Sequence, residues 1–546
     1  MRTILILFLV MASLVFTGCY DDKGNYDYKK INEITINLSD LEALAAAGER
    51  LVFDPEITYS LGDSTGLNVT YEWTFGKKVV GTSRKLDWLI DTMGRDNLAL
   101  RVTNVDNGLV AMATRTMIIS SVYNPNEGFM VLSEKEGKSW LSLVVYEYKK
   151  DENGEYVKDE NNDNVFYCKI IEDVYKKENG EELGSRPLFL REHIADIDYT
   201  QGHLTVFQEG GQGSVDLDGI TMKKDILLVE SFSGQAYPED FHPVDAELMS
   251  WVHLIQNYDG KIYTKIKETR ELFQSGYYIH TPLLFEQKEV RADMLVPMHK
   301  TQDKHYVILH SIGTDKDPEN RLLVVYNYKD LRYDDINSAG KIFTMPEPVY
   351  GWPDNFVPLT DLGDNQVIDV AYMHTTSGWG DGDANYGMFL KTSEGKYLYQ
   401  YFEIEEEYGT DNISYLQDGG KEGLSVWELK NVPVPLEDCV FWTLPSSSNR
   451  YVFIAYGQDI YYLSLDDPQN GIRHYYTCKS NVVKMAGQDY TGEHLMVALE
   501  NGGLLFLNVY QAKNLMTDEE KFIWESGEDV NLGKIVDIIT KVGTAI

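Results

Sequence analysis

Three aromatic residues in two loop-like segments are the side chains best suited to contact a ligand. Tyr350 and Trp352 lie in a segment rich in glycine, proline and aspartate, and Trp379 lies between two glycines. Large aromatic rings in exposed loops are costly to leave in water unless something covers them, and sugar rings and peptide side chains both stack on such rings. We therefore predict ligand contacts at Tyr350, Trp352 and Trp379. The alternative is that the two indoles pack between neighbouring sheets.

Oxygen-bearing side chains alternate just after Trp379. Asp381, Asp383 and Asn385 occupy every second position, which is the spacing found in calcium-binding loops. An EF-hand loop would also need a bidentate acid seven residues after Asn385, where Thr392 stands. The segment is a candidate calcium site, and a solvated acidic turn is the alternative.

Known catalytic motifs are missing from the sequence. It contains no His-Glu-x-x-His pair for zinc, no Gly-x-Ser-x-Gly nucleophile and no phosphate-binding glycine loop. A retaining glycosidase needs two carboxylates about 5 Å apart, but with 86 acidic residues such pairs cannot be recognised from the sequence. We predict a non-catalytic protein that needs no cofactor. The alternative is a hydrolase or lyase acting on glycans.

An apolar run covers residues 4–16 and is too short to span a membrane as a mature helix. Cys19 follows this run closely. The sequence Thr17-Gly18-Cys19 at the end of this run resembles a bacterial lipobox. The resemblance implies that residues 1–18 are a lipoprotein signal peptide and that the sulfur of Cys19 is acylated, for instance with palmitate. The polar residues 19–31 would then be a tether. An ordinary signal peptide with an incidental cysteine is the alternative.

Composition excludes some partners. The formal net charge is −37, which repels nucleic acid and anionic lipid surfaces, so contact with a membrane is expected only through the lipid anchor. Aromatic residues make up 12% of the chain, which favours a folded protein over a disordered one. Besides Cys19, the cysteines are Cys168, Cys439 and Cys478. Three cysteines allow at most one disulfide, and free buried thiols are the alternative.

Short strands dominate residues 32–123 and predict a small β-sandwich. The strand around Trp73 alternates, so that Val69, Tyr71 and Trp73 share one face. Residues 71–75, followed by residues 100–108 with their Asn-Gly turn, resemble a polycystic-kidney-disease (PKD)-type immunoglobulin-like domain. In that family the tryptophan fills the core. The family's Gly-Asp-Gly turn is replaced here by residues 76–78, so the resemblance is to a divergent, PKD-like form.

A turn pattern recurs after a Pro- and Gly-containing linker at residues 124–128. An acidic residue, Gly and Lys precede a strand at residues 136–138, 259–261 and 394–396, and looser copies follow elsewhere. The resulting hairpins lie near residues 140, 204, 263, 324, 398, 461 and 505, mostly about sixty residues apart. Such repetition of small antiparallel sheets is typical of a β-propeller, here of about seven blades over residues 128–546. Unrelated hairpins in stacked sandwiches are the alternative.

Two segments interrupt this period. Residues 149–164 are acidic and rich in turn formers, and we expect a long exposed loop within the first blade. Residues 238–251 contain the run Ala246-Glu247-Leu248-Met249, which predicts a short helix.

The fold class expected is therefore all-β, with a PKD-like sandwich followed by a propeller. Together with the lipobox, this layout is similar to the PKD-like surface lipoproteins of Bacteroidota. That resemblance implies a lipoprotein of the outer membrane, exposed at the cell surface and encoded beside a SusC/SusD-like nutrient importer. The function it implies is non-catalytic: an accessory or binding subunit for a peptide or glycan ligand.

Overall fold

The computed structural model describes residues 31–62, 68–124, 127–149, 151, 156–158, 164–193, 202–269, 272–296, 306–314, 318–327, 339–348, 351–375, 384–405, 415–416, 423–446, 448–487, 492–527 and 530–542. Cys19, Tyr350, Trp379, Asp381 and Asp383 lie outside these ranges. No helix within them is long and apolar enough to cross a membrane. The chain divides into two compact units, Met1–Ile119 (unit 1) and Ser120–Ile546 (unit 2).

Unit 1 is a β-sandwich. Its strands are β1 (Ile34–Asn37), β2 (Leu44–Ala46), β3 (Arg50–Phe53), β4 (Glu56–Tyr59), β5 (Val69–Phe75), β6 (Lys78–Gly81), β7 (Leu86–Leu89), β8 (Gly94–Asn104) and β9 (Val110–Ser120). A five-stranded sheet has the order β2-β9-β8-β5-β6, and two smaller sheets pair β1 with β4 and β3 with β7. Apolar side chains from these sheets form one core cluster.

Trp73 lies at the centre of that cluster, as the alternation along β5 predicts. Its side chain is fully buried, and its indole N–H donates to the backbone oxygen of Ser83 at 3.0 Å. The ring of Phe53 meets the indole edge-on, with the centroids 6.3 Å apart. The neighbouring Glu72 is exposed. The predicted core role of Trp73 is therefore confirmed.

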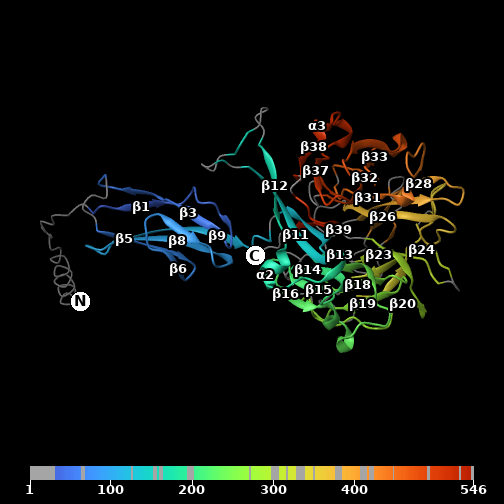
Figure 1. The fold of residues 1–546 in the computed structure, drawn as a ribbon, viewed down its shortest axis with the longest axis horizontal. Coiled ribbons are helices and arrows are strands. Elements are labelled where there is room, and N and C mark those ends of the chain that lie inside the picture. The colour runs from blue at the N-terminus through green and yellow to red at the C-terminus, as the bar shows by residue number, and fades with distance from the viewer. Residues whose placement is uncertain are drawn as a thin grey trace, which may run out of the picture. The chain divides into compact units, whose positions relative to one another are not determined.

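Unit 2 is a β-propeller with seven antiparallel sheets, or blades, among the described residues. In Figure 1 the chain passes around this unit from cyan through green and yellow to red. Blade 1 contains β39 (Lys534–Val542), β10 (Glu127–Lys135), β11 (Lys138–Tyr148) and β12 (Phe166–Ile171). Blade 2 contains β13 (Ser185–His193), β14 (His203–Gly210), β15 (Val215–Asp218) and β16 (Lys224–Leu227). Blade 3 contains β17 (Pro243–Leu248), β18 (Val252–Asn257) and β19 (Ile262–Ile266).

The remaining four blades follow in chain order. Blade 4 contains β22 (Ala292–Leu295), β23 (Tyr306–Ser311), β24 (Arg321–Tyr326) and β25 (Ile342–Thr344). Blade 5 contains β26 (Gln366–Thr375), β27 (Ala384–Lys391), β28 (Tyr397–Glu405), β29 (Tyr415–Leu416) and β30 (Leu424–Leu429). Blade 6 contains β31 (Val440–Thr443), β32 (Tyr451–Tyr456), β33 (Asp459–Ser464) and β34 (Arg473–Thr477). Blade 7 contains β35 (Val482–Gly487), β36 (His494–Leu499), β37 (Leu504–Asn508) and β38 (Phe522–Glu525).

Smaller elements connect the blades. They are the helices α2 (Val174–Asn179) and α3 (Asp518–Lys521), the hairpin of β20 (Leu284–Phe285) and β21 (Lys288–Glu289), and the 3₁₀ turns η1 (Leu228–Ser231), η2 (Ser233–Gln235), η3 (Leu436–Asp438), η4 (Pro468–Asn470) and η5 (Ala512–Asn514). Blade 3 has no fourth named strand among the described residues, but an antiparallel bridge from Lys265 to Tyr278 lies along β19.

The first strand of each blade lies innermost. These strands contact one another from β26 through β31, β35, β39, β13 and β17 to β22. Apolar side chains shared by blades 4 and 5 join the two ends of that series. The second strands are buried almost throughout, as in β18 and β32, because each blade packs between two neighbours.

The ring closes through the C-terminal strand. β39 pairs antiparallel with β10, with Ile539 opposite Met130 and Ile538 opposite Val131. A late segment of the chain thereby supplies the innermost strand of the first blade. This pairing removes the open edge that β10 would otherwise present.

Turn chemistry explains why the blades could be located in the sequence. Gly137, Gly260 and Gly395 all adopt positive φ in the turns before β11, β19 and β28. At Gly260 a Cβ would also approach the backbone oxygen of Ala292 to 3.1 Å. The seven predicted hairpin positions fall in seven different blades. Six lie on third strands, whereas the position near residue 204 lies on the second strand β14.

One local prediction is wrong. Residues 246–249 do not form a helix, because Ala246 and Leu248 belong to β17 and pair with Ile255 and His253. The side chains of Ala246, Leu248 and Met249 are buried. Burial at the innermost position of blade 3 outweighs the modest helix preference of these residue types.

Candidate functional site

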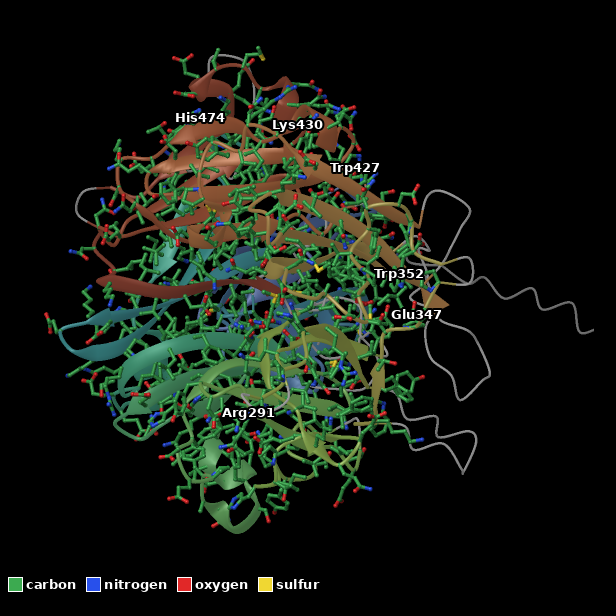
Figure 2. All side chains as sticks on the ribbon, turned by 90° about the vertical axis from the view of Figure 1, so that its right-hand side faces the viewer. Arg291, Glu347, Trp352, Trp427, Lys430 and His474 are labelled. Carbon is green, nitrogen blue, oxygen red and sulfur yellow. The ribbon has the colours of Figure 1, made fainter. Side chains whose placement is uncertain are left out.

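Trp352 lies in the connection between β25 and β26, where two neighbours engage its indole. The N–H donates to Glu347 Oε2 at 2.6 Å, and the ring of Phe356 stacks on it with a centroid separation of 5.5 Å. Figure 2 shows Trp352 and Glu347 side by side. Thr360 donates to the other oxygen of Glu347 at 2.7 Å. Trp352 is partly buried against the core of blades 4 and 5, which is the packing role considered as the alternative to ligand binding.

The other predicted ligand residues, Tyr350 and Trp379, lie outside the described residues, and so do Asp381 and Asp383 of the candidate calcium loop. Asn385 belongs to β27 and is fully buried, and its side-chain oxygen accepts a hydrogen bond from the Tyr401 hydroxyl. Its oxygen is thus directed at another strand of blade 5.

Several charged residues on the innermost strands of blades 1, 2 and 3 form ion pairs. Lys541 of β39 and Glu192 of β13 are both buried and lie 2.6 Å apart. Arg191 pairs with Asp245 of β17 and lies 3.8 Å from Asp537 of β39. Burial disfavours the charged guanidinium of Arg191, but Asp245, Asp537 and Glu247 together outweigh burial and raise its pKa. Glu192, Asp245 and Asp537 on the innermost strands therefore form ion pairs with cations of neighbouring blades. These ion pairs join blades 1, 2 and 3.

A second group of titratable residues lies between blades 2 and 3. His203 begins β14, and its Nδ1 is 2.6 Å from Oδ2 of Asp216 in β15. Thr205 donates to Oδ1 of Asp216 at 2.8 Å, and Gln274 donates to Oδ2 at 3.0 Å. Asp225 of β16 places an oxygen 3.9 Å from the same His203 nitrogen.

The ring of Phe273 connects this group to blade 3. Phe273 stacks on His203 with a centroid separation of 4.1 Å and an interplanar angle of 11°. The ring of His253, from β18, lies 4.8 Å from Phe273. The Lys265 ammonium, from β19, lies 5.0 Å from the centre of the same ring. We call His203, Asp216, Asp225, His253, Lys265, Phe273 and Gln274 the blade 2/3 cluster.

Burial changes the acid–base behaviour of the blade 2/3 cluster. It raises the pKa of Asp216, while hydrogen bonding to His203 opposes that shift. It lowers the pKa of Lys265 to about 7, with Asp216 opposing and Lys267 adding to the shift. It also lowers the pKa of His253 well below the usual value. Perturbed groups gathered in this way mark a candidate functional site.

Sequence reasoning missed the blade 2/3 cluster because its members come from five strands and one connection of two blades. Each residue taken alone is an ordinary polar position in a strand. A signal was present in β14 and β19, where His203 and Lys265 are ionisable residues next to apolar strand residues. The sequence does not reveal that the faces bearing these residues meet.

The three cysteines after Cys19 are free thiols, and Cys478 is buried. Burial raises the pKa of Cys168, Cys439 and Cys478 to about 12. They therefore stay protonated near neutral pH and are poor nucleophiles and metal ligands.

One sequence family matches the chain. Residues 19–187 match the model of the PKD-like family. The match begins at the predicted lipidated cysteine and ends in β13 of blade 2, so that it includes all of the PKD-like unit (unit 1) from residue 19 onward. No curated protein matches.

Solved structures that match the chain are distant. A quinonprotein alcohol dehydrogenase-like protein from Bacteroides thetaiotaomicron is 11% identical, with 94% of this chain and 97% of that chain covered and a TM-score of 0.30. AztD from Citrobacter koseri is 9% identical, with coverage of 87% and 98% and a TM-score of 0.34. The β-propeller domain of Cps50 from Myceliophteria thermophila is 12% identical, with coverage of 63% and 87% and a TM-score of 0.31. Likeness at this level carries no argument about function.

Proposed function

We propose that this protein is a non-catalytic binding subunit of a nutrient uptake system, held to the outer membrane by lipid on Cys19. Its PKD-like unit would stand between the anchor and the propeller, and the propeller would engage a peptide or glycan ligand. Its protein partners would be the components of a SusC/SusD-like importer at the cell surface. The PKD-like match supports this reading together with the resemblance to lipoproteins of Bacteroidota.

One observation favours binding over catalysis. Glu192, Asp245 and Asp537 on the innermost strands each lie beside a cation, whereas a propeller hydrolase needs carboxylates free to act as acid, base or nucleophile at the axis. These three carboxylates therefore serve to join neighbouring blades through ion pairs.

Lipidation is tested with the variant Cys19→Ala. The wild-type chain should fractionate with outer membranes and carry acyl mass on its N-terminal cysteine, whereas the variant should be released or remain unprocessed. Cys478→Ala is the matched control, because it removes a buried thiol without touching the anchor. Membrane fractionation of Cys19→Ala identical to that of the wild type would contradict the anchor.

The accessory role is tested by affinity purification of the tagged full-length chain from native outer membranes. Importer components should co-purify with the wild type and not with an unrelated tagged lipoprotein. The purified chain should release no product from glycans. Detectable glycan turnover would overturn the binding proposal in favour of a hydrolase or lyase.

Ligand contact is tested at Trp352 and Trp379. Replacing both with Ala should weaken ligand or importer binding by about tenfold or more, since one aromatic pair contributes about 0.5–1.5 kcal/mol. Trp352 also packs on Phe356, so the variant Trp352→Phe with Trp379→Ala keeps a ring at position 352 and separates binding from folding. Tyr258→Ala removes an exposed aromatic ring elsewhere and serves as the control. Unchanged binding in both double variants would place the ligand elsewhere.

A further inference from the structure

The outer three strands of blade 2 bring three metal-binding side chains to one point. His203, Asp216 and Asp225 come from the adjacent strands β14, β15 and β16. One ligand atom from each lies within 4.8 Å of the others. Because antiparallel pairing fixes neighbouring strands firmly, a site built on them is held by backbone and not by loops.

Only one of the two carboxylates near His203 forms a hydrogen bond with its ring. Nδ1 of His203 faces two carboxylates, with Oδ2 of Asp216 at 2.6 Å and Oδ2 of Asp225 at 3.9 Å. One N–H can be donated well to only one of them. A divalent cation in place of that proton would attract all three ligand atoms.

The separations of the ligand atoms can be compared with those around a bound ion. Ligands about 2.0–2.2 Å from a tetrahedral metal lie roughly 3.4 Å from one another. The two separations from His203 Nδ1, 2.6 and 3.9 Å, lie on either side of that value. A set of one imidazole and two carboxylates suits a borderline divalent metal such as Zn²⁺, whereas Ca²⁺ prefers oxygen ligands throughout.

Neighbouring side chains already hold two of the ligands in place. Thr205 and Gln274 donate to the two oxygens of Asp216, at 2.8 and 3.0 Å. Phe273 stacks on the His203 ring and fixes its plane. Metal ligands generally depend on such outer partners for their orientation.

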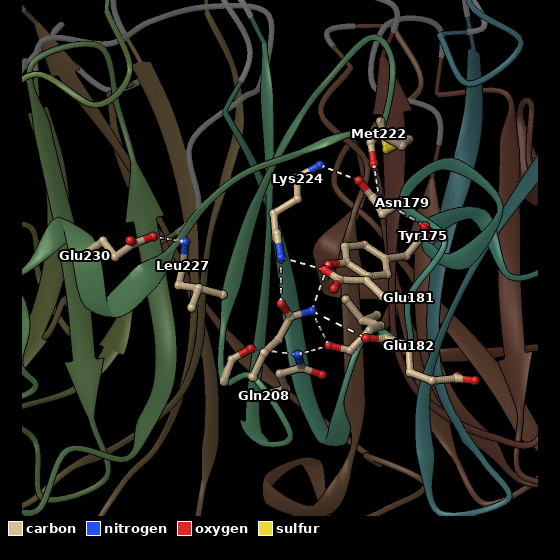
Figure 3. A network of polar contacts seen from close by, with 12 residues as sticks. Tyr175, Asn179, Glu181, Glu182, Gln208, Met222, Lys224, Leu227 and Glu230 are labelled. Carbon is tan, nitrogen blue, oxygen red and sulfur yellow. Dashed lines mark hydrogen bonds and ion pairs between the residues drawn. The ribbon is translucent and has the colours of Figure 1, made fainter.

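The strand that carries Asp225 is held from both sides. The backbone N–H of Lys224 donates to Asn179 at 2.8 Å, and the Lys224 ammonium lies 2.5 Å from Glu181. The backbone N–H of Leu227 donates to Glu230 at 2.8 Å. Figure 3 shows the Lys224 contacts, which link β16 to the segment around α2, and the Leu227 contact, which links β16 to η1. The Asp225 side chain itself is 39% exposed, which leaves an ion a route from solvent.

His253 is a buried imidazole that contacts the outer surroundings of these three residues through Phe273. Its ring is fully buried, and neither nitrogen has a hydrogen-bond partner among the described residues. An imidazole that is buried without hydrogen bonds destabilises the folded protein. Its ring centroid lies 4.8 Å from that of Phe273, the ring that stacks on His203.

We propose that His203, Asp216 and Asp225 of blade 2 form a binding site for one divalent transition-metal ion of the Zn²⁺ class. With three protein ligands, the site keeps a position for water or another ligand, as exchangeable and catalytic zinc sites do. The site is independent of the proposed uptake role, because it involves neither Cys19 nor the predicted ligand residues.

The test is calorimetric titration of the purified full-length chain with Zn²⁺ alone, followed by Co²⁺ titration and its visible spectrum. The wild type should bind one equivalent of Zn²⁺ at this site, and Co²⁺ should give ligand-field bands of a low-coordinate N/O site. The variant Asp225→Asn changes an exposed side chain and should fold normally. It should weaken Zn²⁺ binding by at least about 10–100-fold, the loss typical of outer partners alone. His203→Gln should do the same.

The matched control is His474→Gln. His474 lies 3.3 Å from one carboxylate, that of Asp459, and its side chain is 50% exposed, so it has similar chemistry without the second acid. This variant should bind Zn²⁺ and Co²⁺ as the wild type does. The proposal is overturned if the wild type binds no stoichiometric Zn²⁺, if Ca²⁺ displaces Zn²⁺ at equal concentration, or if binding survives both Asp225→Asn and His203→Gln.

Discussion

Trp73 illustrates how much one side chain contributes to the PKD-like unit. Its indole fills the middle of the core, contacts Phe53 and donates its N–H to the backbone of Ser83, so both its apolar surface and its polar atom are used. A smaller residue would leave a cavity and an unpaired backbone oxygen at once.

We expect Trp73→Ala to lower the free energy of unfolding of the PKD-like unit by about 3–5 kcal/mol. Because a two-unit chain does not unfold in one step, the suitable measurement is hydrogen exchange of the amides in β5 and β8. The control Met112→Ala truncates a side chain that is 66% exposed in the same unit and should change exchange little. Equal protection of β5 in Trp73→Ala and wild type would contradict a central role.

The sequence predicted the role of a residue correctly where that role depends on a single strand. Alternation along β5 places Trp73 inward regardless of what its sheet packs against. The roles of His203, Asp216 and Asp225 depend instead on three strands meeting, and that of Phe273 depends on blade 3 packing on blade 2. No local pattern contains that information, so the blade 2/3 cluster emerged only from the structure.

At the scale of the structural elements, aromatic side chains pack together where blade 7 contacts blade 1. His494 of β36 lies 5.2 Å from Phe506, 5.9 Å from Phe166 and 6.1 Å from Tyr146, measured between ring centroids. Phe166 and Tyr146 belong to blade 1, whereas His494 and Phe506 belong to blade 7. The imidazole thus sits where the last blade meets the first.

Burial among these rings lowers the pKa of His494 from 6.5 to about 4. Between these two values the unfolded chain binds a proton that the folded chain does not, so the free energy of unfolding should fall as the pH is lowered from 6.5 to 4 and level off below. The contribution is at most about 3 kcal/mol, at 1.36 kcal/mol for each pKa unit.

The measurement is urea denaturation of the propeller at a series of pH values, comparing wild type with His494→Leu. The variant keeps an apolar side chain at the interface and should lose this part of the pH dependence. His474→Leu, at an exposed site, is the control and should retain it. If His494→Leu followed the wild-type pH profile, the imidazole would not be the group responsible.

At the level of elements, the sequence predicted turns better than it predicted strand positions. Acid-Gly-Lys turns require a glycine at positive φ, a local demand that is visible in the sequence, and they marked the blades correctly. The segment 246–249 has helix-forming residues but lies in β17, because an inner strand position buries them. Whether this segment forms a helix or a strand is decided by contacts with other strands, and those strands lie outside any short stretch of the sequence.

For the whole molecule, closure of the propeller depends on β39. This strand pairs with β10, places Lys541 against Glu192 and directs Asp537 Oδ2 at the backbone N–H of Leu190 at 2.8 Å. Without it, blade 1 would expose an unpaired edge, and Glu192 would lose a buried cation.

Deleting residues 532–546 should therefore unfold or aggregate the propeller and not merely shorten it. Size-exclusion chromatography and protease resistance of the truncated chain are the measurements. A chain lacking only residues 543–546 keeps all of β39 and is the control; it should elute and resist protease like the wild type. A monomeric truncated chain with wild-type protease resistance would contradict closure by β39.

The position of β39 also constrains when the molecule can fold during its synthesis. β10 leaves the ribosome more than four hundred residues before its partner Ile538 is made. Blades 2 to 7 pair strands that are close in sequence and can form as they emerge, but blade 1 is completed only when β39 has been made. A nascent chain that lacks β39 is consequently an open arc with two unpaired ends. The ring can therefore be completed only after the strand β39 has been synthesised.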